Sequence, residues 1–392
     1  MSFEPKKQAY SARINAVTLG TGDKAIVIGG QNVLPFYSFD APIENAPKVG
    51  VEVSHAAPTW TNAGLAEVYA GCTTLAECAA KAATIPGVDF LALNFAAADP
   101  NGANRSVEDC VADAVAVAAV TDLPLVVLGC KNIEKDTELL SKIAEALTGK
   151  NALFMSAKNE NYKTVGASVA LASGQKLGAE TADDINLAKQ LNIMLKGLNV
   201  NPESIVMDIG TAAVGYGYEY AASTFDRIRL AGLAQGDIDL KMPILAVASV
   251  DAWGVKESTA TEEDEPAWGC QEERAINMEI STAAADLVGG ADAIVLRHNP
   301  KTLEHKGLGF LFIFFTPLLT LSHKCHENER IMYLVFLIIY CESCPMYDRL
   351  IRGLRLWQNA ERLPRQRKRQ RERTSSAVWE RTTANTQAER LA

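Results

Sequence analysis

The sequence TDLPLVVLGCKNIEKDTELLSKIAEALTGKNALFM, residues 121–155, holds two short apolar runs separated by a longer segment. The runs are Leu125–Leu128 and Ala152–Met155, and segment 134–148 between them carries apolar residues at helical spacing. Continuous apolar strands joined by an amphipathic helix are typical of a parallel sheet whose outer face is covered by helices. This stretch therefore predicts an α/β protein.

The same alternation extends on both sides of this stretch. Eight apolar runs are predicted as strands: Val49–Val53, Val88–Leu93, Leu125–Leu128, Ala152–Met155, Lys176–Ala179, Ile205–Met207, Ile244–Val247 and Ala293–Leu296. The segments between them have helical patterns: 74–84, 106–120, 134–148, 160–173, 182–198, 219–235 and 271–289. Capping-box-like starts at Ser106–Asp109 and Thr181–Asp184 support two of these helices.

Eight strand–helix repeats predict a closed (β/α)₈ barrel, the TIM barrel. An open, doubly wound sheet is the alternative. Its dinucleotide-binding version is disfavoured because no G-x-G-x-x-G motif follows the first strand.

The chain divides into three segments. Residues 12–19 and 24–29 flank Gly20–Asp23 and predict a β-hairpin, and a proline-containing connector completes the N-terminal segment, residues 1–47. Residues 48–306 form the predicted barrel. Residues 307–392 form an atypical tail, which is apolar at first and then rich in arginine, and which replaces the last barrel helix.

Charge separates the tail from the rest of the chain. Residues 307–392 hold 14 Lys and Arg against 8 Asp and Glu, whereas residues 1–306 hold 24 against 39. An acidic barrel is a poor partner for nucleic acid, whose phosphates attract clustered basic side chains. No apolar signal segment follows Met1, and the five cysteines before the tail are dispersed, so a cytoplasmic protein with reduced thiols is expected.

The tail allows several interpretations. Its apolar segments 308–321 and 331–340 are shorter than the roughly 20 residues of a membrane helix, which leaves only a re-entrant hairpin and makes membrane association unexpected. The pair Cys341 and Cys344 permits a zinc site, and the basic run 362–373 permits RNA or acidic-membrane binding. The favoured interpretation is a non-native or disordered segment from an aberrant reading frame or gene boundary.

Ligands of such barrels bind at the carboxyl ends of the strands. In this chain those positions are rich in Asn, Gly, Ser and Thr and poor in His and Cys. They show no Ser-His-Asp, H-E-x-x-H or carboxylate–histidine arrangement, so no metal site is expected. This composition favours a surface that holds a large ligand over one that abstracts protons.

Several motifs resemble the small (delta) subunit of the corrinoid iron–sulfur protein of the carbon monoxide dehydrogenase/acetyl-CoA synthase system. The resemblance covers about residues 10–305. It rests on the following stretches: Asp99–Gly102, Pro124–Cys130, Asn161–Thr164, Asp184–Asn192, Val206–Asp208, Gly215–Tyr220, Arg227–Leu230 and Ala293–His298. One departure is Asp208–Thr211, where the family has a proline.

The resemblance implies a barrel that pairs with a large (gamma) subunit. That subunit carries a [4Fe–4S] cluster and most of the corrinoid-binding domain, and the small subunit's barrel mouth covers the other face of the corrinoid. Further implied partners are a methyl-pterin methyltransferase and acetyl-CoA synthase. The implied function is passage of a methyl group from a methyl-tetrahydropterin to acetyl-CoA synthase in the anaerobic acetyl-CoA pathway, with the cofactor and not the side chains carrying the chemistry.

Eight residues at the predicted mouth are candidate corrinoid-binding groups: Asn94, Asp99, Asn101, Asn132, Asn159, Asp208, Thr211 and Tyr216. Catalytic residues are not predicted. Two alternatives remain open. One is a barrel that binds the methyl-pterin itself, through Asp208 with Asn94 or Asn132. The other is a purely structural subunit.

Overall fold

The computed structural model describes residues 7–298, except residues 36, 38, 39 and 61. The predicted tail, and with it the prediction that the last barrel helix is replaced, lies outside these residues. The predicted N-terminal hairpin is confirmed: strands β1 (Ala16–Leu19) and β2 (Ile26–Gly29) pair antiparallel.

Eight parallel strands form the second sheet, in the order β8-β7-β6-β5-β4-β3-β10-β9. The end strands β8 and β9 meet through a bridge between Met207 and Ile244, and Met207 N donates to Pro243 O at 2.8 Å. The predicted TIM barrel is therefore confirmed, and the open sheet is excluded. The strands are β3 (Lys48–Ser54), β4 (Phe90–Asn94), β5 (Leu125–Leu128), β6 (Leu153–Ala157), β7 (Lys176–Glu180), β8 (Ile205–Asp208), β9 (Leu245–Ala246) and β10 (Ala293–Leu296).

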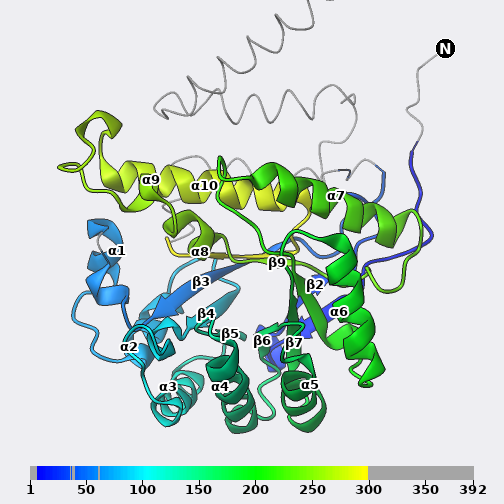
Figure 1. Ribbon diagram of the computed structural model, residues 1–392, viewed down its shortest axis with the longest axis horizontal. Coiled ribbons are helices and arrows are strands. Elements are labelled where there is room, and N and C mark those ends of the chain that lie inside the picture. The colour runs from blue at the N-terminus through cyan, green and yellow to red at the C-terminus, as the bar shows by residue number, and fades with distance from the viewer. Residues whose placement is uncertain (1–6, 36, 38–39, 61, 299–392) are drawn as a thin grey trace, which may run out of the picture. The chain divides into compact units, whose positions relative to one another are not determined.

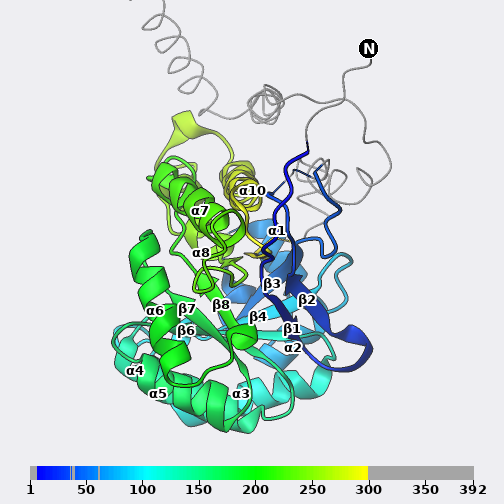
Figure 2. The same ribbon diagram turned by 90° about the vertical axis from the view of Figure 1, so that its right-hand side faces the viewer.

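Helices surround this sheet, and α7, α9 and α10 lie together across one side of it with α8 beneath them (Figures 1 and 2). The α-helices are α1 (Ala63–Val68), α2 (Leu75–Ala82), α3 (Val107–Val120), α4 (Ile133–Ala146), α5 (Tyr162–Val165), α6 (Ile185–Gly197), α7 (Tyr218–Leu233), α8 (Ala248–Trp253), α9 (Lys256–Thr259) and α10 (Gln271–Gly289). A π-helical stretch, Gly166–Ala172, continues α5. Short 3₁₀ turns cover Gly22–Lys24, Ala57–Thr59, Ala96–Ala98, Pro202–Ser204 and Pro266–Trp268.

Of the two predicted caps, one is confirmed and one is wrong. The Ser106 hydroxyl accepts the N–H of Asp109 at 3.0 Å and begins α3. Helix α6, however, is capped by Asp184, which accepts the N–H groups of Asn186 and Leu187, and Thr181 lies before it. Asp184 is the cap because a cap stands directly before the first helical residue, and Asp is as good a cap as Thr.

No helix within the described residues is long and apolar enough to cross a membrane.

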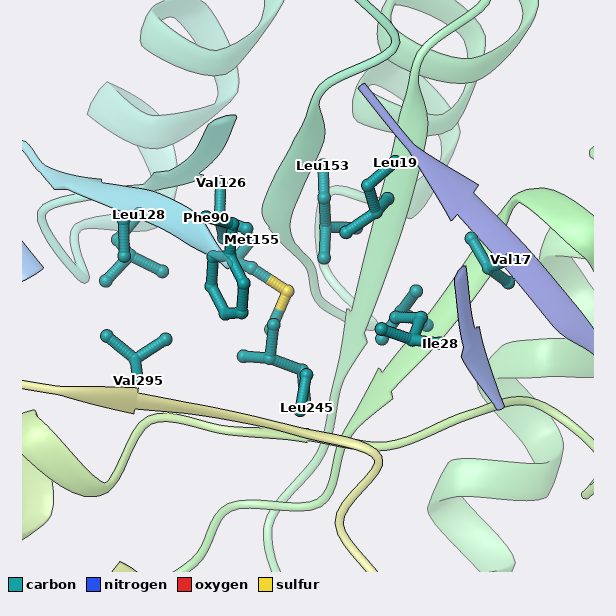
Figure 3. Packing of buried hydrophobic residues seen from close by; sticks show 13 residues of the cluster. Val17, Leu19, Ile28, Phe90, Val126, Leu128, Leu153, Met155, Leu245 and Val295 are labelled. Carbon is teal, nitrogen blue, oxygen red and sulfur yellow. The ribbon is translucent and has the colours of Figure 1, made fainter. Parts of the chain in front are cut away.

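The barrel interior is filled by alternate strand residues and by the hairpin. Figure 3 shows Val17, Leu19 and Ile28 of the hairpin packed towards Leu153 and Met155 of β6. The other cluster members come from the remaining barrel strands: Phe90, Ala92, Val126, Leu128, Val206, Leu245, Ala293 and Val295.

The hairpin closes the amino-terminal end of the barrel. Gly20 N donates to Asn151 O at 2.9 Å, and Asn15 N donates to Lys241 O at 2.7 Å. Asn151 Nδ2 donates in return to Thr18 O and Gly20 O. Because Asn151 and Lys241 precede strands β6 and β9, the end that remains for a ligand is the carboxyl end of the strands.

Candidate functional site at the carboxyl end of the barrel

The uppermost inward positions of the barrel are polar. Side chains alternate along a strand, so every second residue faces inward. On β4 and β10 the inward positions run from the apolar core residues Phe90 and Ala293 to Asn94 and Arg297. The same alternation ends on Glu180 in β7 and Asp208 in β8. The interior thus changes from an apolar core to a charged layer at the carboxyl ends of the strands.

One section of this layer joins the first and last barrel strands. Glu52 of β3 is 1% exposed and accepts hydrogen bonds from Arg297, at 3.0 Å to Oε1 and 3.2 Å to Oε2. Asn94 Nδ2 donates to the same carboxylate at 2.9 Å. The Arg297 guanidinium lies over the rings of Trp60 and Trp253, 4.7 and 5.1 Å from their centroids. Such stacking restricts the guanidinium to one orientation.

Glu279 of α10 holds the end of β10. Its carboxylate accepts the backbone N–H groups of Arg297 and His298, and His298 Nδ1 lies 2.6 Å from Oε2. Burial acts to raise the pKa of Glu279, but the contacts to His298 and to these backbone groups outweigh it and lower the pKa. The His298 ring stacks on Trp253 at 5.4 Å.

A second charged group surrounds Glu180. Its carboxylate receives Lys131 Nζ at 3.2 Å, Lys158 Nζ at 3.1 Å and the Ser156 hydroxyl. Burial acts to raise the pKa of Glu180, but the two ammonium groups and the hydroxyl prevail and lower it. Lys131 has a φ of 69°, an unusual conformation for a non-glycine residue, and its ammonium group contacts Glu180 at the end of β7.

Three aspartates lie beside this group without a comparable counter-charge. Burial, followed by the charge of Glu180, raises the pKa of Asp208 to about 6. Burial, followed by the charge of Asp208, raises the pKa of Asp251 in α8 to about 7, although the Thr211 hydroxyl donates to it at 2.5 Å. Burial also raises the pKa of Asp286 in α10 well above the ordinary value. Burial thus favours the neutral form of all three carboxyl groups more than in an ordinary aspartate.

The loop 209–217 contacts two of these aspartates, since Gly210 N donates to Asp208 Oδ1 at 3.0 Å and Thr211 donates to Asp251. Gly210, Gly215 and Gly217 have φ values of 69°, 94° and 90°, which residues with a Cβ rarely adopt. The loop is held by Thr211 at Asp251, and further along by Val214 N, which donates to the Thr282 hydroxyl at 3.3 Å.

The structure brings only some of the predicted residues together. Asp208 and Thr211 meet at Asp251, and Asp99 and Asn101 share one turn, in which Asp99 Oδ1 accepts Asn101 N at 2.9 Å. The other predicted residues have separate environments.

Asn94 and Asn132 are engaged within the fold, since Asn94 binds Glu52 and Ala96 N and Asn132 caps α4. Asn159 is exposed at the rim. Tyr216 is 49% exposed, and its hydroxyl donates to Glu257.

Among the buried carboxyl groups of this end that the sequence analysis did not identify are Glu52, Glu279 and Asp286. Each has a signal in the sequence. Glu52 is the one charged residue within the apolar run 49–53, and Glu279 and Asp286 are seven residues apart on the apolar face of one helix. Among residues 7–298, apart from the four omitted positions, no cluster of His, Cys, Asp and Glu is arranged to hold a metal ion.

The described residues define an α/β barrel that carries a layer of charged side chains at the carboxyl ends of its strands. The chain belongs to the CO dehydrogenase/acetyl-CoA synthase delta subunit family, whose model matches residues 16–300. This confirms the family resemblance predicted from the motifs.

Curated relatives carry the same description. The chain is 33% identical over 308 residues to the acetyl-CoA decarbonylase/synthase complex subunit delta of Archaeoglobus fulgidus, covering 76% of this chain and 68% of that protein. It is 31% identical over 284 residues to subunit delta 2 of Methanosarcina acetivorans, covering 71% and 64%. The chain thus spans about two thirds of the length of these relatives. Among solved structures, it is similar to 7,8-dihydropteroate synthase from Vibrio fischeri ES114, with TM-score 0.47, 11% identity, and coverage of 78% of this chain and 100% of that one.

Proposed function

We propose that this chain is the subunit of a corrinoid methyl carrier whose barrel mouth covers one face of a corrinoid held mainly by a large (gamma) subunit. The complex passes a methyl group from a methyl-tetrahydropterin to acetyl-CoA synthase in the cytoplasm. The gamma subunit also carries the [4Fe–4S] cluster, and a methyl-pterin methyltransferase delivers the methyl group. When bound, the corrinoid supplies the nucleophilic cobalt that accepts the methyl group.

The observation that carries this proposal is the state of the histidines. Both histidines in the described residues are held internally: His55 Nε2 lies 2.8 Å from Asp113, and His298 is buried against Glu279. Each ring thus has one nitrogen in contact with a carboxylate, and its other nitrogen is buried. A mouth that covered the corrinoid without a histidine ligand would leave the methyl-transfer chemistry to the cofactor.

The rim fits the periphery of a corrinoid, which carries amide side chains. Asn101 and Asn159 are exposed there, and an amide both donates and accepts hydrogen bonds. Asn94 and Asn132 are less suited to this role because their side chains are engaged within the fold. Asp99 acts through the turn that presents Asn101, and Thr211 and Tyr216 act through the loop they hold.

The proposal is tested by binding of the full chain to a corrinoid-loaded large subunit. We expect a stable pair and a changed corrinoid absorbance spectrum on mixing. The double variant Asn101→Ala/Asn159→Ala should weaken pairing and reduce the spectral change. The matched control is Gln235→Ala, which removes an exposed amide after α7 at the hairpin end of the barrel. The assignment of the rim would be refuted if the double variant paired normally and gave the same change in the corrinoid spectrum as the unchanged chain.

A second candidate function rests on Asp208. Its carboxyl group lies at the end of β8, burial raises its pKa to about 6, and it provides hydrogen-bonding atoms that suit a pterin ring. If the chain binds the pterin itself, titration calorimetry should detect binding of methyl-tetrahydropterin to the chain alone, and Asp208→Asn should weaken this binding. If neither pterin nor cobalamin binds while the large subunit still pairs tightly, the chain is a structural subunit.

A further inference from the structure

The ammonium group of Lys131 is held far from the strand that precedes it. Lys131 follows β5, yet its Nζ lies 3.2 Å from Glu180 Oε1 at the end of β7. Strand β6 lies between β5 and β7, so this contact spans two strand spacings, about 10 Å. The Lys131 side chain is 60% exposed, whereas that of Glu180 is 18% exposed. Lys131 therefore extends across the carboxyl ends of the strands while it remains accessible to a ligand.

Glu180 fixes the position of this ammonium group. Its carboxylate also receives Lys158 Nζ at 3.1 Å and the Ser156 hydroxyl, which hold it in place. Within the described residues Lys131 Nζ makes no other hydrogen bond, so two of its three N–H groups are free to donate. Burial acts to lower the pKa of Lys131, but the charges of Asp208 and Glu180 outweigh it and raise the pKa. Lys131 is thus a charged, positioned donor, which suits an oxygen atom of a ligand.

The ammonium groups at this end of the barrel are balanced by carboxyl groups. Glu180 and Asp208 are in register on the neighbouring strands β7 and β8, so their side chains point to the same face. Lys131 and Lys158 therefore face two carboxyl groups, and Asp251 in α8 adds a third. An anion gains little here, because the carboxyl groups repel it while the ammonium groups attract it. The ligand atoms that fit Lys131 are neutral acceptors, such as the carbonyl oxygens of amides.

We propose that Lys131 is a ligand-binding residue of the barrel mouth, whose ammonium group donates hydrogen bonds to a carbonyl oxygen of a neutral amide group on the ligand. Glu180 is the positioning residue that holds the ammonium group there. This inference rests on the proposed function, in which the ligand is a corrinoid and the amide groups are those of its periphery. The ring carbonyl of a pterin offers the same chemistry, so the experiment has one arm for each ligand.

Binding measurements on the full chain test the proposal. In one arm the chain is titrated into the corrinoid-loaded large subunit and the corrinoid absorbance is followed. In the other arm the chain alone is titrated with methyl-tetrahydropterin in a calorimeter. We expect Lys131→Met to weaken binding of the ligand that occupies the mouth by about tenfold or more, the usual loss for a hydrogen bond from a charged donor. Lys131→Arg keeps a charged donor and should recover most of the affinity.

A matched control and a salt series separate this contact from other effects. Lys142 of α4 is also paired with carboxylates, those of Glu108 and Glu138, and its side chain is 44% exposed, so Lys142→Met should leave binding unchanged. Because the proposed acceptor is neutral, the ratio of the affinities of the unchanged chain and Lys131→Met should be the same at about 50 and about 300 mM salt. A contact with an anion predicts instead a ratio that falls as salt is added.

Two results would overturn the proposal: Lys131→Met binds as tightly as the unchanged chain, or its loss of affinity disappears at high salt. Melting curves should show that Lys131→Met is folded, because Glu180 keeps Lys158 and Ser156 as partners. If methionine lowers the melting temperature, Lys131→Gln provides the same comparison.

The two arms also distinguish this proposal from the proposed function. If the unchanged chain binds the pterin but not the loaded large subunit, the proposed function fails, and the pterin arm still decides the role of Lys131. If the unchanged chain binds neither ligand, both proposals are wrong.

Discussion

Replacing Arg297 by methionine tests whether the polar layer at the mouth also holds the barrel closed. Arg297 stands at the end of β10, and its partner Glu52 lies on β3, so the pair joins the last strand to the first. Methionine fills much of the same space without a charge. The substitution leaves Glu52, which is 1% exposed, with Asn94 as its remaining hydrogen-bond donor.

The magnitude follows from that burial. Breaking a buried ion pair by removing one partner costs about 3–5 kcal/mol. We expect about 3 kcal/mol for Arg297→Met, at the lower end of that range, because Asn94 still donates and the arginine side chain is 15% exposed. Loss of the cation–π contacts with Trp60 and Trp253 adds about 0.5–1 kcal/mol. The total is a large fraction of a typical stability of about 5–15 kcal/mol.

Urea unfolding of four proteins measures the effect: the unchanged chain, Arg297→Met, Glu52→Gln and the double variant. Since the double variant contains no unpaired charge, it should be more stable than the sum of the single changes predicts, with a coupling energy of at least about 1.5 kcal/mol. A cost below about 1 kcal/mol for Arg297→Met, or strictly additive changes, would show that the pair does not close the barrel.

Three further changes are predicted. Gly50→Ala should destabilise the fold by about 2 kcal/mol in urea unfolding, because its Cβ would overlap the buried Phe90 ring. Glu279→Gln should cost about 2–3 kcal/mol at neutral pH, because the amide holds the backbone and ring of His298 less well. The unchanged protein should lose the same contribution in acid, since a lowered pKa means that stability falls as the carboxylate is protonated. Ser106→Ala should lower the melting temperature by removing the α3 cap, worth about 1 kcal/mol.

Each of these predictions has a result that contradicts it. Gly50→Ala should cost less stability when Phe90 is also replaced by leucine, because the smaller side chain leaves room for the new Cβ. If Gly50→Ala costs the same in both backgrounds, the overlap with Phe90 is not its cause. If Glu279→Gln and the unchanged chain unfold at the same acid midpoint, protonation of Glu279 does not contribute to the loss of stability in acid. Ser106→Thr keeps a capping hydroxyl and should retain most of the stability, and a loss as large as that of alanine would point to a cause other than the cap.

The fold was predictable because the strands of a parallel barrel are buried on both faces. Runs such as Leu125–Leu128 and Ala293–Leu296 are recognisable as strands without knowledge of their partners, and the structure gives the same bounds. The cap of α6 was misplaced by three residues because Thr181 and Asp184 both satisfy the local rule. Only the observed start of the helix distinguishes them.

The site was predictable only partially, because it depends on contacts between distant residues. The end of a strand identifies Asp208, but the pKa of its carboxyl group depends on Glu180 and on burial. Asn94 and Asn132 stand where ligand groups are expected, yet their side chains are used by Glu52 and by the α4 cap. A sequence shows which positions face the mouth, whereas the partner of each side chain is a property of the folded barrel.

The hairpin covers the amino-terminal end of the barrel, so the two ends of the barrel differ and the hairpin end can be used for attachment. Its turn, residues 21–24, is exposed and lies at the pole opposite the mouth. A fluorophore or surface tether attached through Asp23→Cys, in a chain whose exposed Cys270 and whose Cys325, Cys341 and Cys344 are replaced by serine, would direct the carboxyl ends of the strands away from the surface. Partners that approach the mouth should then bind to the immobilised chain as they do to the free one.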